Sequence, residues 1–381
     1  MKVGIPRETR EGETRVAIVP ETVPPLIKFG AEVYVEKSAG EKASFSDQQY
    51  SEAGAKVPET AQELYRECDL ILKVQPPTQE ELSLIKDGST LVGLFWVLSN
   101  RQLVDSSLAK KLTVYSLELV PRITRAQSMD VLSSMSTVAG YKMVLLSTEK
   151  FGKFLPLLMT AAGTIPPANV LVIGAGVAGL QAIATAKRLG AKVEAFDTRP
   201  AVKEQVESLG ARFVAMELPK DSETAGGYAK EMSEEFIKKE MEAISSRLPK
   251  TDIVITTAQV FGKKAPLLMT EEMVKLMRKG SVIVDLAAEQ GGNCALTEAG
   301  KTVVKHGVTL VGPINLPASM PTHASQMYAK NMVNLIKNIY RGDGMQADYS
   351  DEINAGCCVC RQGELVSEAV KKAFSSGGDL K

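Results

Sequence analysis

The chain has 381 residues, of which 44% are hydrophobic and 24% charged, a composition typical of a globular protein large enough for two cores. Lysine plus arginine and aspartate plus glutamate both number 45, so the formal net charge is zero and no basic field attracts nucleic acid. The longest apolar runs fall short of the ~18 residues of a membrane helix, and the N-terminus lacks the apolar stretch of a signal peptide. Five cysteines, an odd number, favour a reducing compartment over a disulfide framework. We therefore expect a cytoplasmic protein with no nucleic-acid partner and no direct membrane insertion.

Short apolar runs typical of strands alternate with helix-like segments through residues 1–120. The expected strands are VGIP (3–6), AEVYVE (31–36), DLILKVQ (69–75), LVGLFWV (91–97) and LTVYSLEL (112–119). The expected helices are PETVPPLIKFG (20–30), AQELYREC (61–68) and NRQLVDSSLAKK (100–111). Regular β-α-β alternation predicts a parallel, doubly wound sheet.

A loop and a helix over residues 121–152 link this region to the next one. Around its segment RAQSMD (125–130), polar side chains are denser than a linker needs: Arg122, Gln127, Asp130 and Ser133. They stand just ahead of a second domain, where a cleft would open, and such clefts are preferred ligand sites. Two alternatives remain open, because Asp130 could instead cap the helix that begins at VLSS and Gln127 could be ordinary surface.

Residues 170–199 form one β-α-β unit with a dinucleotide fingerprint, GAGVAG, at 174–179. Gly174 permits the tight turn, Gly176 lets the backbone approach a pyrophosphate, and Gly179 lets the next helix pack closely on the strand. Asp197 ends the second strand at about the 20-residue distance where a carboxylate binds the adenosine ribose and repels a 2′-phosphate. The cofactor-binding residues predicted for this unit are Gly174, Ala175, Gly176, Val177, Gly179, Asp197, Thr198 and Arg199. Arg199 could clamp a 2′-phosphate, but beside Asp197 we expect it to cover the adenine or the pyrophosphate, and NAD is favoured.

The segments that follow complete a second sheet of about six strands. EQVESLGARFV (204–214), TDIVITT (251–257), GSVIVDLA (280–287) and a last strand, VTLVGP (308–313), continue the alternation. A long amphipathic helix at 325–340 is expected to return the chain to the first domain, where GCCVC (356–360) and GELV (363–366) add strands. The fold class is therefore α/β, with two Rossmann-like doubly wound parallel-sheet domains separated by a cleft. Their expected bounds are 1–133 plus 322–381 for the first domain and 134–321 for the second.

A polar insertion at 217–250 is longer than ordinary connections in such folds. We expect a mobile loop at about 217–235 that closes over the nucleotide, with Gly226 and Gly227 as hinges and Tyr228 as a contact. The alternative is an ordinary surface loop.

Two residue types that often carry chemistry give no clear site. Cys357 and Cys360 have C-x-x-C spacing, but no second pair follows, so we expect buried thiols and no metal. His306 and His323 are the only histidines, and neither has an evident acidic partner. Oxidising an alcohol or amine needs such a base, whereas hydride exchange between two nicotinamide rings needs only their juxtaposition.

Motifs along nearly the whole chain are similar to those of the NAD(H)-binding components of proton-translocating nicotinamide nucleotide transhydrogenases. The most specific are RAQSMD (125–130) and ETAGGYAKEM (223–232), accompanied by KVGIPRE, VDLAAEQGGN and LPASMPTHASQMYAKNMVNL. The resemblance implies a homodimer that binds NAD(H) and exchanges hydride directly, with Re/Si specificity, with NADP(H) on a partner component. It also implies coupling to proton translocation by membrane-spanning subunits, and thus a peripheral position on the inner membrane, on the matrix side in mitochondria.

The resemblance also assigns roles to individual residues. Arg122, Asp130 and Ser133 match contacts to the nicotinamide half of NAD(H), and Gln127 matches a glutamine that reaches the NADP(H) side. Arg122, Gln127 and Asp130 are therefore the expected catalytic residues. Asp197 matches the ribose carboxylate and Tyr228 the tip of a mobile loop.

Alanine dehydrogenases of the same superfamily offer an alternative function. This chain keeps the arginine and lysine that match their substrate-binding pair, Arg15 and Lys73. It lacks their catalytic histidine in LVGLFWVLSN (91–100) and has Glu289 where they have aspartate. A non-catalytic NAD-sensing subunit is a third possibility.

Overall fold

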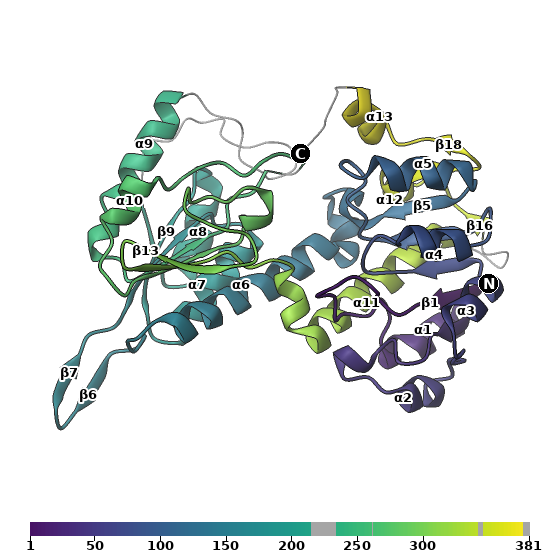
Figure 1. Ribbon diagram of the computed structural model, residues 1–381, viewed down its shortest axis with the longest axis horizontal. Helices are drawn as coiled ribbons and strands as arrows, with labels where there is room; N and C mark the ends of the chain where they lie inside the picture. The colour runs from purple at the N-terminus through teal and green to yellow at the C-terminus, as the bar shows by residue number, and fades with distance from the viewer. Residues whose placement is uncertain (215–233, 261, 342–345, 376–381) are drawn as a thin grey trace. The chain divides into compact units, whose positions relative to one another are not determined.

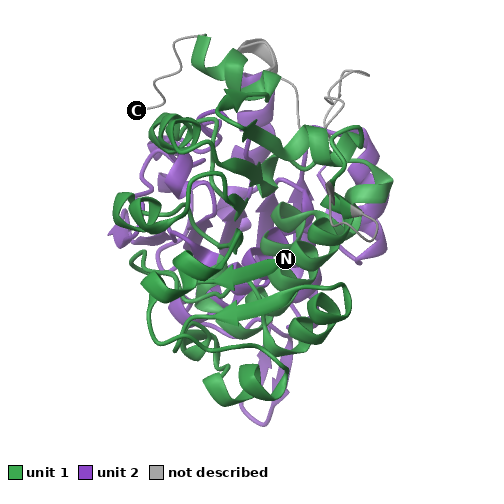
Figure 2. Ribbon diagram, turned by 90° about the vertical axis from the view of Figure 1, so that its right-hand side faces the viewer, with its two compact units in different colours: residues 1–135, 317–381 green, residues 136–316 purple. Residues whose placement is uncertain are grey.

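The computed structural model describes residues 1–214, 234–260, 262–341 and 346–375 (Figure 1). The chain forms two compact units: unit 1 comprises residues 1–135 and 317–381, and unit 2 comprises residues 136–316 (Figure 2). In the described residues of each unit, the main sheet has seven strands that are mostly parallel. The predicted α/β class, with two Rossmann-like parallel-sheet units, is confirmed.

The sheet of unit 1 has the order β18-β17-β5-β4-β3-β1-β2. Its parallel strands are β1 (Lys2–Ile5), β2 (Glu32–Val35), β3 (Leu70–Leu72), β4 (Thr90–Gly93) and β5 (Thr113–Ser116). The C-terminal segment adds β17 (Cys358–Arg361) and β18 (Glu364–Leu365), antiparallel, beside β5. All the strands expected over residues 1–120 are present, and the tail returns to this sheet as predicted.

The helices of unit 1 are short, apart from the one that brings the chain back. They are α1 (Val23–Lys28), α2 (Asp47–Glu52), α3 (Ala61–Glu67), α4 (Gln79–Leu84), α5 (Arg101–Ala109), α11 (Pro321–Ile339), α12 (Glu352–Cys357) and α13 (Glu368–Ser375). Helix α11 begins at Pro321, four residues before its predicted start. A proline is well suited to a first helical position, where its missing N–H is not needed.

The sheet of unit 2 has the order β10-β9-β8-β11-β12-β14-β13. Its strands are β8 (Asn169–Ile173), β9 (Lys192–Phe196), β10 (Arg212–Phe213), β11 (Ile253–Thr256), β12 (Val282–Asp285), β13 (Thr302–Lys305) and β14 (Val308–Val311). The seventh strand, β13, was not predicted: it pairs antiparallel with β14 at the sheet edge. Three of its four residues are exposed, so the apolar run of a buried strand is missing.

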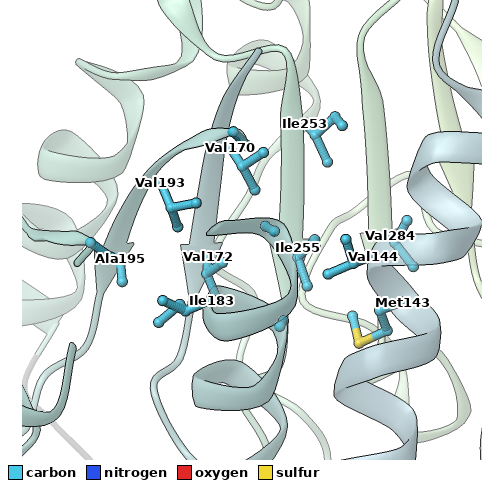
Figure 3. Close-up of a cluster of buried hydrophobic side chains, with 14 of the residues drawn as sticks. Met143, Val144, Val170, Val172, Ile183, Val193, Ala195, Ile253, Ile255 and Val284 are labelled. Carbon is cyan, nitrogen blue, oxygen red and sulfur yellow. The ribbon is translucent and has the colours of Figure 1, made fainter. Parts of the chain in front are cut away.

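Side chains from alternate positions of β8 enter two separate cores. Val170 and Val172 face one core, together with α6 (Val131–Lys150) and α7 (Val177–Arg188) (Figure 3). Leu171 and Ile173 face the other core, with Ile244 and Leu248. That second face carries α9 (Glu234–Ser245) and α10 (Glu271–Lys275), while α8 (Lys203–Ser208) precedes β10. Helices on both faces explain why these strands are apolar throughout.

A further hairpin, which the sequence did not reveal, extends from unit 2 beyond its main sheet (Figure 1). It consists of β6 (Leu158–Thr160) and β7 (Gly163–Ile165), paired antiparallel. Met159 is 80% exposed, and Phe154, Leu157 and Ile165 are also exposed. Within the described residues, none of the helices combines the length and apolar character that crossing a bilayer requires.

Candidate nucleotide-binding site

The fingerprint turn of unit 2 depends on two glycines that cannot be replaced without strain or collision. Gly174 has a φ of +94°, in the left-handed region that side chains disfavour. Its carbonyl oxygen accepts a hydrogen bond from Thr257 Oγ1 at 2.9 Å. A Cβ on Gly179 would lie 1.9 Å from that same oxygen, so only glycine lets α7 approach the turn this closely. The roles predicted for Gly174 and Gly179 in the turn and in packing agree with this geometry.

Gly176 is different, because its Cα faces open space. A Cβ there would meet only Arg199 Nη2, at 4.0 Å. Gly176 is the N-cap of α7, and no described side chain caps the helix. The first amides of the helix therefore remain available to an anion, and the positive end of the helix dipole lies there as well. Val177, 43% exposed, and buried Ala175 flank this position.

The helix that carries the turn is held by a second close contact. A Cβ on Gly140 of α6 would lie 2.2 Å from the carbonyl oxygen of Ala178, so the two helices touch through backbone atoms. This contact fixes the N-terminal end of α7, where the free amides lie.

Asp197 and Arg199 lie together at the end of β9, next to this turn. The Asp197 carboxylate accepts hydrogen bonds from Ala175 N at 2.6 Å and from Arg199 N, Nε and Nη2 at 2.8, 2.9 and 2.8 Å. Asp197 and Thr198 are buried, and the Arg199 side chain is 15% exposed. The predicted ribose carboxylate is therefore next to the turn, but its oxygens already hold the Arg199 guanidinium. A ribose fits this position only after Arg199 has released the carboxylate.

Sequence reasoning missed several residues that brace the same sheet edge. The buried Asp285 carboxylate accepts from Thr256 Oγ1 at 2.8 Å and from Asn293 N at 2.8 Å. Asn293 in turn bonds the backbone of Ala258 and of Pro266. The motif VDLAAEQGGN contains Asp285 and Asn293, and it was noticed only through the resemblance.

The predicted residues of unit 1 lie on a firmly held turn. Asn331 and Asn334 of α11 donate to the carbonyl of Ser128 at 2.8 and 3.1 Å, within a 3-10 helix over Thr124–Met129. Arg125 Nη1 lies 2.6 Å from Asp351 Oδ2. This anchoring leaves the side chains of Arg122 and Gln127 exposed.

Asp130 and Ser133 are brought together at the start of α6. The Asp130 carboxylate accepts from Ser133 N at 2.9 Å and from Ser133 Oγ at 2.6 Å, which is the pattern of a helix cap. The capping alternative raised for Asp130 is therefore what the structure shows. Tyr228 and the expected loop hinges lie outside the described residues.

One expectation about the histidines was wrong. His306 does have an acidic partner, since its Nε2 lies 2.8 Å from Glu271 Oε1. It precedes β14, and so lies at the amino edge of a sheet whose carboxyl edge carries the fingerprint turn. Glu271 lies 35 residues away in sequence, and spacing could not reveal it.

The three clustered cysteines are buried thiols, as predicted. Cys357 ends α12, and Cys358 and Cys360 lie in β17 beside β5. Burial raises the pKa of Cys360 to about 12, so its thiol is not ionised at neutral pH. Among the described residues, no group of three or more histidine, cysteine or carboxylate side chains could hold a metal ion.

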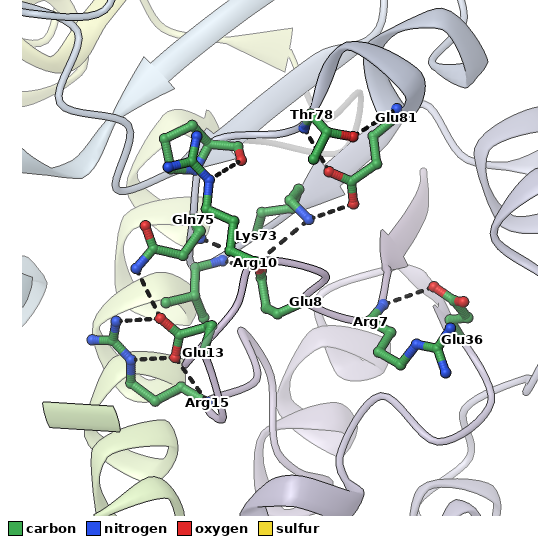
Figure 4. A network of polar contacts seen from close by, with 12 residues as sticks. Arg7, Glu8, Arg10, Glu13, Arg15, Glu36, Lys73, Gln75, Thr78 and Glu81 are labelled. Atoms are coloured by element: carbon green, nitrogen blue, oxygen red, sulfur yellow. Dashed lines mark hydrogen bonds and ion pairs between the residues drawn. The ribbon is translucent and has the colours of Figure 1, made fainter. Parts of the chain in front are cut away.

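Arg15 and Lys73 belong to a buried ionic network in unit 1 (Figure 4). Lys73 Nζ lies 2.8 Å from Glu81 Oε1 and 3.4 Å from Glu8 Oε2. Arg15 Nε and Nη2 donate to the two oxygens of Glu13 at 2.8 and 2.7 Å. Burial disfavours ionisation of Glu13, but Arg15 outweighs it and lowers the pKa of Glu13 to about 2. Each cation is thus paired with a carboxylate of its own unit.

Two family models match the chain: the alanine dehydrogenase/PNT N-terminal domain at residues 4–139 and the alanine dehydrogenase/PNT C-terminal domain at residues 143–368. The chain is 51% identical over 379 residues to the first of the polypeptides that make up NAD(P) transhydrogenase subunit alpha in Rhodospirillum rubrum, covering 97% of this chain and 99% of that protein. The crystal structure of transhydrogenase from Sinorhizobium meliloti matches with a TM-score of 0.88 and 41% identity, covering 96% of this chain and 100% of that one. An L-alanine dehydrogenase structure matches with a TM-score of 0.84 and 27% identity, covering 99% of both chains.

Proposed function

The chain belongs to the alanine dehydrogenase/PNT family, and we propose that it is the NAD(H)-binding component of a proton-translocating transhydrogenase. In this role it exchanges hydride with NADP(H) held by a partner component, and membrane-spanning subunits couple the exchange to proton movement. The observation that carries the proposal is the full-length similarity to a transhydrogenase alpha subunit in a chain with a complete dinucleotide turn.

The NAD(H) site is proposed at the carboxyl edge of the unit 2 sheet. The amides at Gly176 and Val177 would receive the pyrophosphate, and Asp197 the adenosine ribose. When bound, NADH supplies the hydride. Arg199 leaves Asp197 as the ribose arrives and remains beside the open face of Gly176, where a guanidinium favours the pyrophosphate charge.

The residues of unit 1 are proposed to position the nicotinamide. Arg122, Asp130 and Ser133 contact the nicotinamide half of NAD(H), and Gln127 reaches the NADP(H) side. Support comes from the anchored 3-10 helix, which leaves Gln127 exposed while α11 holds the backbone beneath it. Hydride exchange between two nicotinamides requires orientation and no added base, which suits a site without histidine.

The proposed assembly is a homodimer that meets the membrane through its partner subunits. The exposed apolar side chains of the β6–β7 hairpin support a protein interface there, because such residues seldom cluster on a monomer surface without a partner.

The proposal is tested by binding and transfer with the full chain. We expect NADH to bind at least ~10-fold more tightly than NADPH, because a 2′-phosphate would face Asp197. With the NADP(H)-binding component added, Gln127→Asn should slow NADH-dependent reduction of an NADP+ analogue by up to ~100-fold, since small misplacements are costly in juxtaposition catalysis. Its NADH affinity should stay unchanged.

Equal affinities for the two cofactors would contradict the assignment of Asp197. Full activity of the Gln127 variant would contradict the assignment of that residue. Reduction of NAD+ with alanine by the chain alone would favour the alanine dehydrogenase alternative, which Arg15 and Lys73 leave open. Binding of NADH without transfer to any partner would favour a sensing subunit.

A further inference from the structure

One carboxyl group of unit 2 is buried without a hydrogen-bond partner. Glu240 lies on α9 and is only 8% exposed. Among the described residues, no donor or cation pairs with its side chain, and the charge that acts on it is that of Asp197. A buried polar group without a partner costs free energy, so its retention at this position points to a ligand.

The contacts of α9 show that it runs antiparallel to β9. Just beyond the C-terminal end of the helix, Arg247 Nη1 lies 3.8 Å from Glu194 Oε2 in the middle of the strand. One turn earlier, Ile244 packs in the same core as Phe196, the last residue of the strand. The helix therefore advances toward its N-terminus as the strand advances toward its carboxyl end.

This alignment places Glu240 beside Asp197. Going from 247 back to 240 covers about 10 Å of helix, and going from 194 to 197 covers about 10 Å of extended chain. Glu240 also lies on the helix face of Ile244, which is buried against the sheet. The two carboxyl groups thus meet at the edge of the sheet that carries the fingerprint turn.

The surrounding charges leave Glu240 without a counterion. On β9 and β10, Glu194 is paired with Arg212 and Arg247, and Asp197 with Arg199. On and after α9, the other ionisable side chains are exposed: Lys238, Lys239, Glu242 and Lys250. Burial and repulsion from Asp197 raise the pKa of Glu240 to about 7. Its carboxyl is therefore neutral over the lower physiological pH range, and it has both a donor and an acceptor.

We propose that Glu240 recognises the adenine of NAD(H), accepting a hydrogen bond from the 6-amino group and donating its own O–H to N7. The inference rests on the proposed function, which places the ribose at Asp197 and therefore the attached base nearby. A neutral carboxyl presents the same donor and acceptor pair with which asparagine and glutamine read this adenine edge. An ionised carboxylate cannot donate to N7, so this contact is lost at high pH.

The test compares Glu240→Gln, Glu240→Leu and, as a matched control, the exposed neighbour Glu242→Gln. The dissociation constants of NADH and of reduced nicotinamide hypoxanthine dinucleotide are measured by fluorescence from pH 6 to 9, and thermal unfolding confirms the fold of each variant. For the wild type and the control, NADH affinity should fall above pH 7 by up to ~10-fold per unit. Glu240→Gln keeps a donor and an acceptor at every pH, so its affinity should stay constant within about twofold.

Glu240→Leu should bind NADH on the order of tenfold more weakly than the wild type at pH 6.5. It should not distinguish adenine from hypoxanthine, whereas the wild type should, because hypoxanthine has no 6-amino donor. Wild-type NADH affinity in Glu240→Leu, or a wild-type pH profile in Glu240→Gln, would overturn the inference. If the wild-type chain binds no NADH at any pH, the proposed function itself fails and the inference with it.

Discussion

Gly179 and Gly176 belong to one fingerprint, yet an added methyl group should affect the protein in opposite ways at the two positions. In Gly179→Ala the new Cβ would lie 1.9 Å from the carbonyl oxygen of Gly174, whereas carbon and oxygen normally stay more than 3 Å apart. The neighbour is backbone and cannot rotate away, so α7 must move by about 1 Å from the turn. We expect a loss of about 2–3 kcal/mol in the free energy of unfolding, the usual cost of overpacking, and a fall of roughly 5–10 °C in melting temperature.

Gly176→Ala is the matched control. Its Cβ would meet only Arg199 Nη2 at 4.0 Å, and its φ of −73° suits alanine, so its melting temperature should stay within ~1 °C of the wild type. Its NADH affinity should nevertheless fall at least ~10-fold, because the methyl group projects where the pyrophosphate must approach the backbone. Calorimetry and fluorescence titration measure the two effects. Wild-type stability of Gly179→Ala would refute the packing argument, and wild-type NADH affinity of Gly176→Ala would refute the placement of the pyrophosphate.

Two further predictions concern buried charges. Lys73→Met leaves Glu8 and Glu81 without their cation, so the free energy of unfolding in urea at pH 7.5 should fall by about 3–5 kcal/mol, with most of it recovered by adding Glu81→Gln. Because burial raises the pKa of Glu8, this loss should shrink toward pH 5, and a loss independent of pH would contradict the electrostatic cause. The pKa of Glu240 lies at about 7 in the folded chain against an ordinary 4.5, so ionisation weakens folding as the pH rises between these values. Glu240→Gln should therefore be more stable than the wild type at pH 8, by up to about 3 kcal/mol, and similar to it at pH 4.5; an equal difference at both pH values would argue against a buried ionisation.

The fold and the fingerprint could be predicted because their signals are local. Strands buried on both faces are continuous apolar runs, as in β8 and β11, and glycine spacing identifies a phosphate-binding turn directly. The strands that were missed, β13 and the β6–β7 hairpin, are mostly exposed and carry no such run.

Pairwise contacts between distant residues could not be predicted in this way. The partner of His306 lies 35 residues away, and Lys73 finds one of its carboxylates in Glu8 at the other end of the first sheet segment. Glu240 illustrates the same limit from the opposite side. A glutamate four residues before a buried isoleucine resembles any solvated helix position, and only the packing of α9 on β9 shows that it faces inward.

The contacts of Asp197 change the explanation of cofactor choice that its position in the sequence suggested. The carboxylate has about four acceptor positions, and the structure fills them with two backbone amides and two guanidinium donors of Arg199. Under the proposed function, the two ribose hydroxyls of NADH replace the two guanidinium donors one for one, and the backbone amides of Ala175 and Arg199 stay in place. A 2′-phosphate brings no donor in exchange for the guanidinium, so one carboxylate oxygen loses a hydrogen bond and faces a like charge as well. Preference for NADH then follows from the hydrogen bonds that are exchanged at Asp197 as much as from repulsion between charges.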